Sequence, residues 1–151
     1  MKRRRTRAKA AGKKGKQVSQ CCLLAAPTGC ASFQMKYGAT TAHRAFSIPA
    51  VGAFRRMGRQ GERFRKKQAG LLNSRLIVLD ERSMLGRMFV GKIVSRVEEF
   101  LGQGFGPPGT SLGGRDLLLI GDDKQIAPIG DEPLYQEGGY TGRSKGAEDG
   151  P

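Results

Sequence analysis

The chain has 151 residues, enough for one domain with a buried core. Its 27 Lys and Arg outnumber its 13 Asp and Glu, and the net charge of +14 favours a polyanionic partner. An odd number of cysteines (Cys21, Cys22 and Cys30) argues against a disulfide framework, and one histidine without a CxxC pair argues against a zinc site. No apolar run approaches the roughly 20 residues that span a membrane.

The N-terminal part, residues 1–20, is basic and almost free of large aliphatic side chains, so we expect a disordered tail. It could be a solvated tail, a nuclear-localisation run at residues 2–5 or a nucleic-acid-binding arm. An Arg-rich start without acids also permits an organellar transit peptide. We therefore expect a nuclear location, with the mitochondrion or another organelle as the alternative.

Three aliphatic runs predict strands: CCLLAA (21–26), LIVL (76–79) and LLLI (117–120). We expect the three cysteines to be buried fillers in a reducing compartment. Between the last two strands, apolar residues four apart predict an amphipathic helix over 83–101, with Ser83 as its N-cap. Residues 47–70 mix Gly, Arg and Lys without a period and are predicted to be a basic loop. We expect the domain to span 21–135 and a disordered tail to follow at 136–151.

Strand, helix and strand in this order predict an α/β fold with a parallel sheet, whose strands end at one edge. Asp80 and Glu81 follow one strand, and Asp122 and Asp123 follow the next. Three or four carboxylates should therefore converge at the carboxyl edge, where such sheets bind ligands. Mg²⁺ fits this set best, although acids that only stabilise a helix N-terminus would look similar.

Four short motifs extend this pattern: APTGCAS (26–32), TAHRAF (41–46), DERSM (80–84) and GDDKQIAP (121–128). In this order they resemble the petite-integration-frequency (PIF) type helicases of superfamily one, over residues 22–135. The resemblance implies a partial RecA-like, P-loop NTPase sheet of about three strands with flanking helices. It also implies an ATP-dependent DNA helicase acting in repair, recombination and telomere maintenance, with Mg²⁺ and ATP as cofactors. The partner would be single-stranded DNA, without a membrane, and we expect a monomer.

The resemblance also implies roles for single residues. Asp80 would hold Mg²⁺ through water, and Glu81 would orient the water that attacks the γ-phosphate. Asp122 and Gln125 would sense the nucleotide, and Gln125 would pass its presence to the DNA. The DNA path would be lined by Pro27, Thr28, Gly29, Thr41, His43 and Phe46.

Some of these roles stay open. His43 could equally be an ordinary surface histidine. Arg82 replaces an aliphatic residue of the family pattern and could pair with Glu81, which would hinder the catalytic role of Glu81.

The phosphate-binding loop of such motors is not found. GKKGKQ (12–17) has the wrong glycine spacing and no hydroxyl to bind a metal. We therefore expect the isolated chain to be a motor fragment that hydrolyses ATP negligibly. We also expect strand 117–120 to leave an unpaired aliphatic edge. Two alternatives remain: a non-enzymatic nucleic-acid-binding protein, and a metal-dependent nuclease using Asp80, Glu81 and Asp122.

Overall fold

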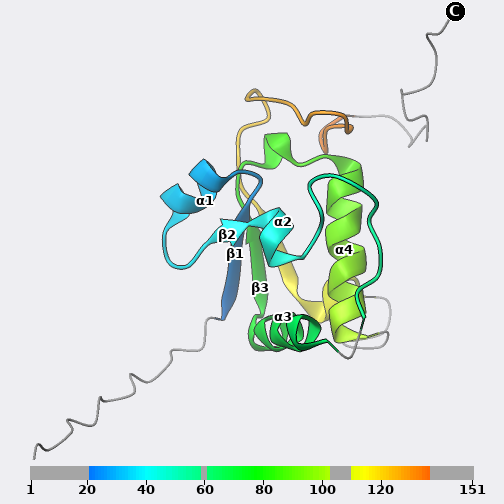
Figure 1. Ribbon diagram of the computed structural model, residues 1–151. Helices are drawn as coiled ribbons and strands as arrows, with labels where there is room; N and C mark the ends of the chain where they lie inside the picture. Colours follow the sequence, from blue (N-terminus) through cyan, green and yellow to red (C-terminus); the bar gives the residue numbers. More distant parts are fainter. Residues whose placement is uncertain (1–20, 59–60, 103–109, 137–151) are drawn as a thin grey trace, which may run out of the picture.

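The computed structural model describes residues 21–58, 61–102 and 110–136 (Figure 1). The predictions for the N-terminal tail, for GKKGKQ and for residues 137–151 lie outside these ranges. Within them the chain forms a parallel sheet of four strands in the order β2-β1-β3-β4. The strands are β1 (Cys22–Ala26), β2 (Thr40–Thr41), β3 (Leu76–Leu79) and β4 (Asp116–Leu119). The predicted parallel α/β sheet is confirmed, with the short strand β2 in addition.

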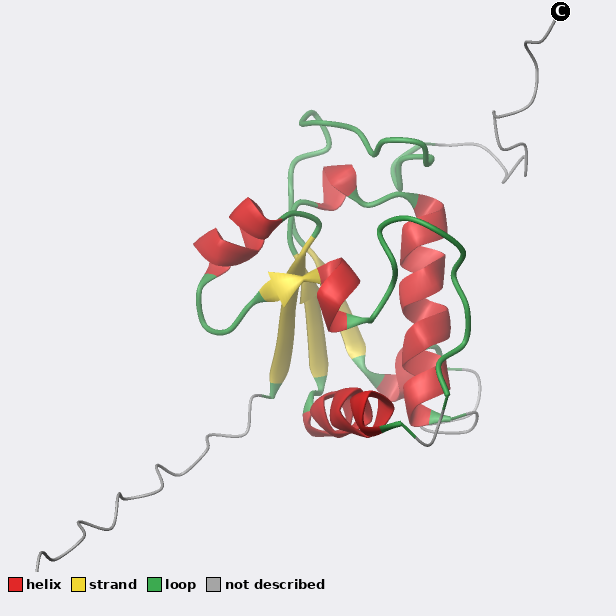
Figure 2. Ribbon diagram, in the orientation of Figure 1, coloured by secondary structure: helices red, strands yellow, loops and turns green. Residues whose placement is uncertain are grey.

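The helices lie mainly on one face and at one end of this sheet (Figure 2). They are α1 (Gly29–Met35), α2 (Ala42–Ala45), α3 (Glu62–Asn73) and α4 (Arg87–Leu101), with short 3₁₀ turns at Arg82–Met84 and Leu112–Gly114. None of the described helices is long and apolar enough to cross a membrane.

The core lies between the sheet and the helices that cover its front face. Alternate strand residues point into it, among them Ala25 of β1, Ile77 and Leu79 of β3, and Leu117 of β4. Phe100 of α4 packs edge-on against Phe64 of α3, with ring centroids 5.2 Å apart. These contacts explain why the continuous aliphatic runs became strands, since both faces of each strand carry apolar side chains.

The prediction that residues 47–70 form a loop is wrong for their second half, because α3 begins at Glu62. The first half is irregular and is held on α4 by the Arg96 side chain, which is 1% exposed. Arg96 pairs with Glu99, donates to the Arg55 carbonyl at 2.8 Å and stacks on Phe54.

The start of the long helix also differs from the prediction. Ser83 lies in the 3₁₀ turn rather than at an N-cap, and α4 begins after Gly86. The two main-chain amides of Met88 and Phe89 are instead capped by the Asp131 carboxylate, at 3.0 and 2.9 Å.

The cysteines are not the buried fillers that we expected. All three are free thiols; Cys21 and Cys30 are exposed, and Cys22 is half-buried. Cys21 precedes β1, and Cys30 lies in the first turn of α1, so neither reaches the core.

Candidate nucleotide site and nucleic-acid interface

The ends of β3 and β4 are joined by main-chain hydrogen bonds at the carboxyl edge of the sheet. The Ile120 amide donates to the Leu79 carbonyl, and the Arg82 amide donates to the Ile120 carbonyl, both at 2.9 Å. Asp80 and Glu81 therefore lie beside the turn that carries Gln125. The predicted placement of these two motifs at the carboxyl edge of the sheet agrees with these hydrogen bonds.

Gly121 permits this close approach. A Cβ atom at this position would lie 2.6 Å from the Arg82 amide nitrogen, and its φ of +145° disfavours any residue with a side chain. The backbone of Glu81 and Arg82 therefore requires glycine at position 121, the first residue of GDDKQ.

Glu81 has a left-handed backbone, with φ 53° and ψ 51°. Such a conformation costs roughly 1–2 kcal/mol for a residue other than glycine, and strained residues of this kind gather at functional sites. The Glu81 amide donates to the Asp80 carboxylate at 2.9 Å, which orients one Asp80 oxygen. Both carboxylates are half-buried and lie at the open edge of the sheet.

Arg82 pairs with Asp123, and not with Glu81, the other partner that the sequence allowed. The Nε atom of Arg82 donates to the Asp123 Oδ1 atom at 2.8 Å, and its Nη2 atom contacts the other oxygen. The two side chains are 40% and 32% exposed, so water screens this ion pair. Its main effect is geometric: it ties the β4 turn to the residue after Glu81 and leaves Glu81 out of the pair.

The remaining carboxylate, Asp122, forms a hydrogen bond within the turn that follows β4. It accepts a hydrogen bond from the Lys124 amide at 3.0 Å, and the Gln125 amide donates to its carbonyl at 3.2 Å. The carboxylates thus lie at one edge, but they do not form the expected metal-binding cluster. In the described ranges, no group of three His, Cys, Asp or Glu side chains is close enough to hold a metal.

The second set of motif residues lies at the ends of β1 and β2. The Thr28 hydroxyl accepts from the Ala31 amide at 3.2 Å, and the Thr41 hydroxyl accepts from the Arg44 amide at 3.3 Å. Each threonine thus caps a short helix through its oxygen, and its hydroxyl proton can still be donated to a ligand. Both are half-buried, with Pro27 half-buried and Gly29 exposed beside them.

The two ring residues of TAHRAF differ. His43 is half-buried, with its ring centroid 4.5 Å from that of Phe89. Burial lowers the pKa of His43, and the nearby charge of Lys92 lowers it further. Phe46 has no exposed surface and packs in the core, so the expected contact between its ring and DNA is wrong for this conformation.

Sequence reasoning missed Asp131, and it placed Asp123 among the edge carboxylates without its pairing to Arg82; both residues fix the loop between β4 and Tyr135. The sequence feature that could have indicated the Asp131 contact is Gly86. A Cβ atom at residue 86 would lie 2.1 Å from the Asp131 carboxyl group, so only glycine leaves room for it. The Arg87 amide also donates to the Glu132 carbonyl at 2.8 Å. The loop that carries Gln125 is thus anchored at both ends.

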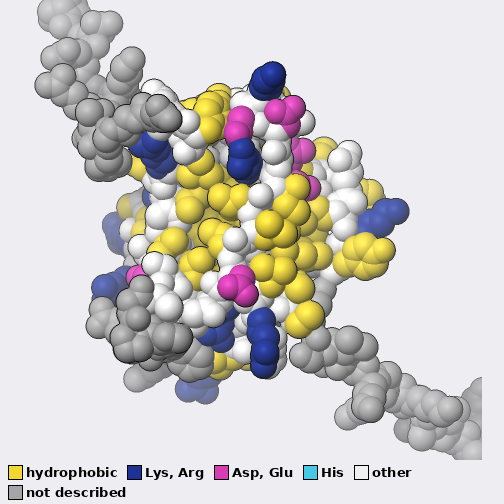
Figure 3. Space-filling view, turned by 180° about the vertical axis from the view of Figure 1, so that it is seen from behind, with side chains coloured by type: hydrophobic (Ala, Val, Ile, Leu, Met, Phe, Trp, Pro, Cys, Tyr) yellow, Lys and Arg dark blue, Asp and Glu magenta, His cyan; other side chains and the backbone are white. Residues whose placement is uncertain are grey.

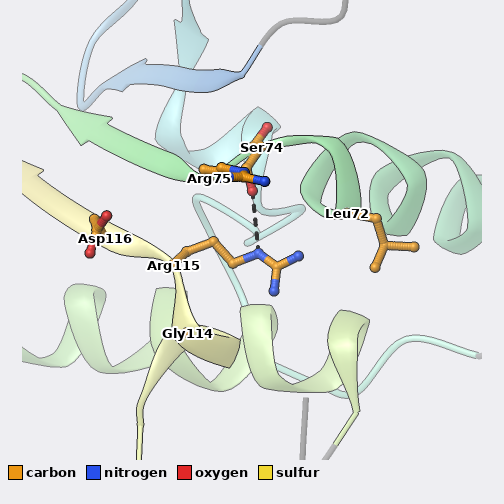
Figure 4. Close-up of a pocket in the computed structure, with 6 residues that line it drawn as sticks. All are labelled: Leu72, Ser74, Arg75, Gly114, Arg115 and Asp116. Carbon is orange, nitrogen blue, oxygen red and sulfur yellow. Dashed lines mark hydrogen bonds between the residues drawn. The ribbon is translucent and has the colours of Figure 1, made fainter. Parts of the chain in front are cut away.

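A shallow hollow of about 400 Å³ lies at the opposite edge of the sheet, where β3 and β4 begin (Figure 4). It is lined by Leu72, Ser74, Arg75, Gly114, Arg115 and Asp116. The Arg115 guanidinium donates to the Ser74 carbonyl at 3.3 Å and to the Gly113 carbonyl at 2.6 Å. It therefore serves the local backbone, and this hollow is separate from the motif residues.

Comparisons with known proteins agree with the motif assignment. No curated protein matches the sequence. Among solved structures, a Pif1 helicase from Bacteroides in complex with ADP-AlF3 and ssDNA is 26% identical with a TM-score of 0.59, covering 73% of this chain and 24% of that one. A Bacteroides Pif1 bound to ssDNA is 27% identical with a TM-score of 0.58 and covers 72% and 24%.

A Pif1 helicase from Candida albicans, at 22% identity and a TM-score of 0.52, covers 72% of this chain and 23% of that one, and shows the same fold. This chain thus spans about a quarter of the length of the structures that it matches. The model of the PIF1-like helicase family matches residues 9–138, most of the sequence. The chain belongs to the PIF1-like helicase family.

Proposed function

We propose that this chain is part of the first RecA-like motor domain of an ATP-dependent DNA helicase. In that role it would couple hydrolysis of Mg–ATP to movement along single-stranded DNA. The observation that carries the proposal is the joined edge of the sheet, where Asp80 and Glu81 meet the turn of Gln125. The Bacteroides relative solved with ADP-AlF3 and ssDNA supports both ligands.

The described residues fit a magnesium ion that arrives with a nucleotide. Mg²⁺ commonly uses one or two carboxylates, several waters and the phosphates of its substrate. Asp80 supplies one half-buried carboxylate, already oriented by the Glu81 amide. Asp80 would hold the ion through water, and the ion would neutralise charge on the phosphates.

In this proposal Glu81 would orient the attacking water. Two observations support this role: the neighbouring Arg82 pairs with Asp123 and not with Glu81, and Glu81 has a left-handed backbone. Gln125 lies on the anchored loop and would report the γ-phosphate to the rest of the domain. On the other side of β1, the hydroxyls of Thr28 and Thr41 would donate to the backbone of a single strand, a contact that does not depend on sequence.

The proposal is tested by nucleotide protection in a melting assay on the full chain. We expect millimolar Mg–ATP to raise the melting temperature, because a ligand that binds only the folded state stabilises it. The Asp80→Asn and Gln125→Ala variants should lose this shift. Asp116→Asn is the matched control, since Asp116 is exposed at the other end of β4.

Hydrolysis is measured in the same samples. We expect a negligible rate from the isolated chain, and a clear rate that Glu81→Gln abolishes would contradict this expectation. If Mg–ATP shifts neither the natural chain nor its variants, the proposal fails, and the non-enzymatic nucleic-acid-binding alternative takes its place. The nuclease alternative needed a cluster of carboxylates that the described residues do not form.

A further inference from the structure

Five cations gather on the side of the molecule formed by α2, α3 and α4, and we call this surface the cationic face. They are Arg44 of α2, Arg63, Lys66 and Lys67 of α3, and Lys92 of α4. Only Arg44 lies within one of the four motifs. The function proposed above gives no role to any of the five cations.

Direct contacts bring the three helices together. The Lys67 ammonium donates to the Arg44 carbonyl at 2.6 Å, which joins α3 to α2. The Gln68 side chain donates to the Phe100 carbonyl at 2.7 Å, which joins α3 to α4. The His43 and Phe89 rings join α2 to α4. The cationic face is therefore fixed by packing.

The charges of the cationic face lie close enough to repel one another. Burial lowers the pKa of Lys67, and Arg63, Arg44 and Lys66 lower it further, in this order. Lys92 acts in the same way on His43. Arg63 and Lys67 are four residues apart on α3, a spacing at which like charges destabilise a helix.

Acidic side chains do not relieve this repulsion. Glu62 stands four residues before Lys66, yet in the described part of the chain none of the five cations is in an ion pair; those that form involve Arg82, Arg87 and Arg96. The rear of the molecule contrasts with this surface, because hydrophobic side chains gather at its centre (Figure 3). The five cations thus lie together without acidic partners among the described residues, and such an uncompensated cluster indicates an anionic ligand.

We propose that the cationic face binds the phosphodiester backbone of a nucleic acid, as a second anchoring site beyond the hydroxyls of Thr28 and Thr41. The proposal rests on the proposed function, since it extends the nucleic-acid contact of the same domain. Lysine and arginine contacts to phosphate carry no sequence information, and each releases condensed counterions. The neighbouring rings of His43 and Phe89 pack on each other, so neither is available to stack on a base. The ligand is therefore recognised by charge.

The test compares two arginines of one helix. Arg63 lies one helical turn before Lys67 and on the same side of α3, whereas Arg65, two residues before Lys67, lies on another side of the helix. Both side chains are exposed, so replacement by glutamine leaves the fold intact, which a thermal melt confirms. We would measure binding of the full chain to a fluorescent oligothymidylate by anisotropy, without nucleotide, over a range of NaCl concentrations.

We expect Arg63→Gln to weaken binding and to reduce the slope of log K against log salt by about 0.7, the value for one lost contact to a single strand. The double variant Arg63→Gln/Lys66→Gln should lose about twice as much, and Arg65→Gln should match the natural chain. Residues 1–20 are the same in all variants, so they do not affect these differences.

Equal slopes for the Arg63 and Arg65 variants would overturn the proposal. It would also be overturned if anionic phosphatidylglycerol vesicles, and not the oligonucleotide, showed the loss on Arg63→Gln. Failure of the proposed function would instead leave the melting temperature unchanged by Mg–ATP, so the two failures are distinguishable.

Discussion

His43 lies between two helices, with its ring on Phe89 and the charge of Lys92 nearby. Both its burial and Lys92 disfavour the charged imidazolium, so its pKa in the folded chain lies below the ordinary value of 6.5. In the window between these two values the unfolded chain binds more protons than the folded one. The free energy of unfolding must therefore fall as the pH falls through 6.5 toward the folded pKa.

We predict that His43→Gln removes this pH dependence. Urea titrations of the natural chain and the variant, from about pH 7.5 to about pH 5, should give unfolding free energies that diverge as the pH falls, with the natural chain losing more. Lys92→Gln keeps the imidazole but removes a repelling charge, and should reduce the loss. If the two curves of unfolding free energy against pH are parallel, protonation of His43 does not destabilise the folded chain.

The candidate site shows what residue types alone can predict. Asp80, Glu81 and Gln125 were assigned to one edge from strand order and motif spacing, and the backbone contacts agree. The partner of Arg82 could not be predicted, because the choice between Glu81 and Asp123 depends on the left-handed turn at Glu81 and on the path of the β4 loop. Phe46 was misassigned because an aromatic residue in a motif can serve the core as well as a ligand.

Among the elements, strands were easier to predict than helices. The aliphatic runs of β1, β3 and β4 specify buried strands by themselves, and the observed bounds differ from the predicted ones by at most one residue. Helix α3 was missed because only two of its residues, Phe64 and Leu71, are buried, and its other contacts are to distant parts of the chain. The N-terminus of α4 was missed because Asp131, which caps it, lies 43 residues after Met88 and 42 residues after Phe89 in the sequence.

We predict opposite effects for alanine at two glycines near this helix. Gly86→Ala places a Cβ atom 2.1 Å from the Asp131 carboxyl group. It should displace that cap and lower the free energy of unfolding by about 1 kcal/mol or more. Gly91→Ala, inside α4 with open space around it, should raise the free energy of unfolding by up to about 1 kcal/mol. Urea denaturation measures both.

The control for this pair is Asp131→Ala, which removes the same two hydrogen bonds without adding bulk at Gly86. In the Asp131→Ala background, Gly86→Ala should lose most of its effect, because the two groups no longer collide. If Gly86→Ala is as stabilising as Gly91→Ala, then the loop that carries Asp131 does not cap α4 in solution.

At the scale of the molecule, the sheet has a covered front and a partly bare rear. Hydrophobic side chains gather at the centre of the rear (Figure 3). In β4, Leu117 and Leu119 pack against the core, whereas Leu118 is 46% exposed and Ile120, just after the strand, is 45% exposed. Strand β4 is also the edge of the sheet, since in the described residues it pairs with β3 alone. The predicted unpaired aliphatic edge is thus present.

An edge strand with free main-chain groups and exposed aliphatic side chains is a template for pairing with another chain. We predict that the isolated protein self-associates through β4 and that Leu118→Lys suppresses this, because a buried lysine charge would oppose the pairing of two edges. The matched control is Leu72→Lys, which adds the same charge on α3 at a leucine that is 45% exposed, close to the 46% of Leu118. Light scattering at increasing protein concentration should then fall for Leu118→Lys and stay near the natural level for Leu72→Lys. Equal suppression by both variants would attribute the effect to net charge, and β4 would then not be the site of association.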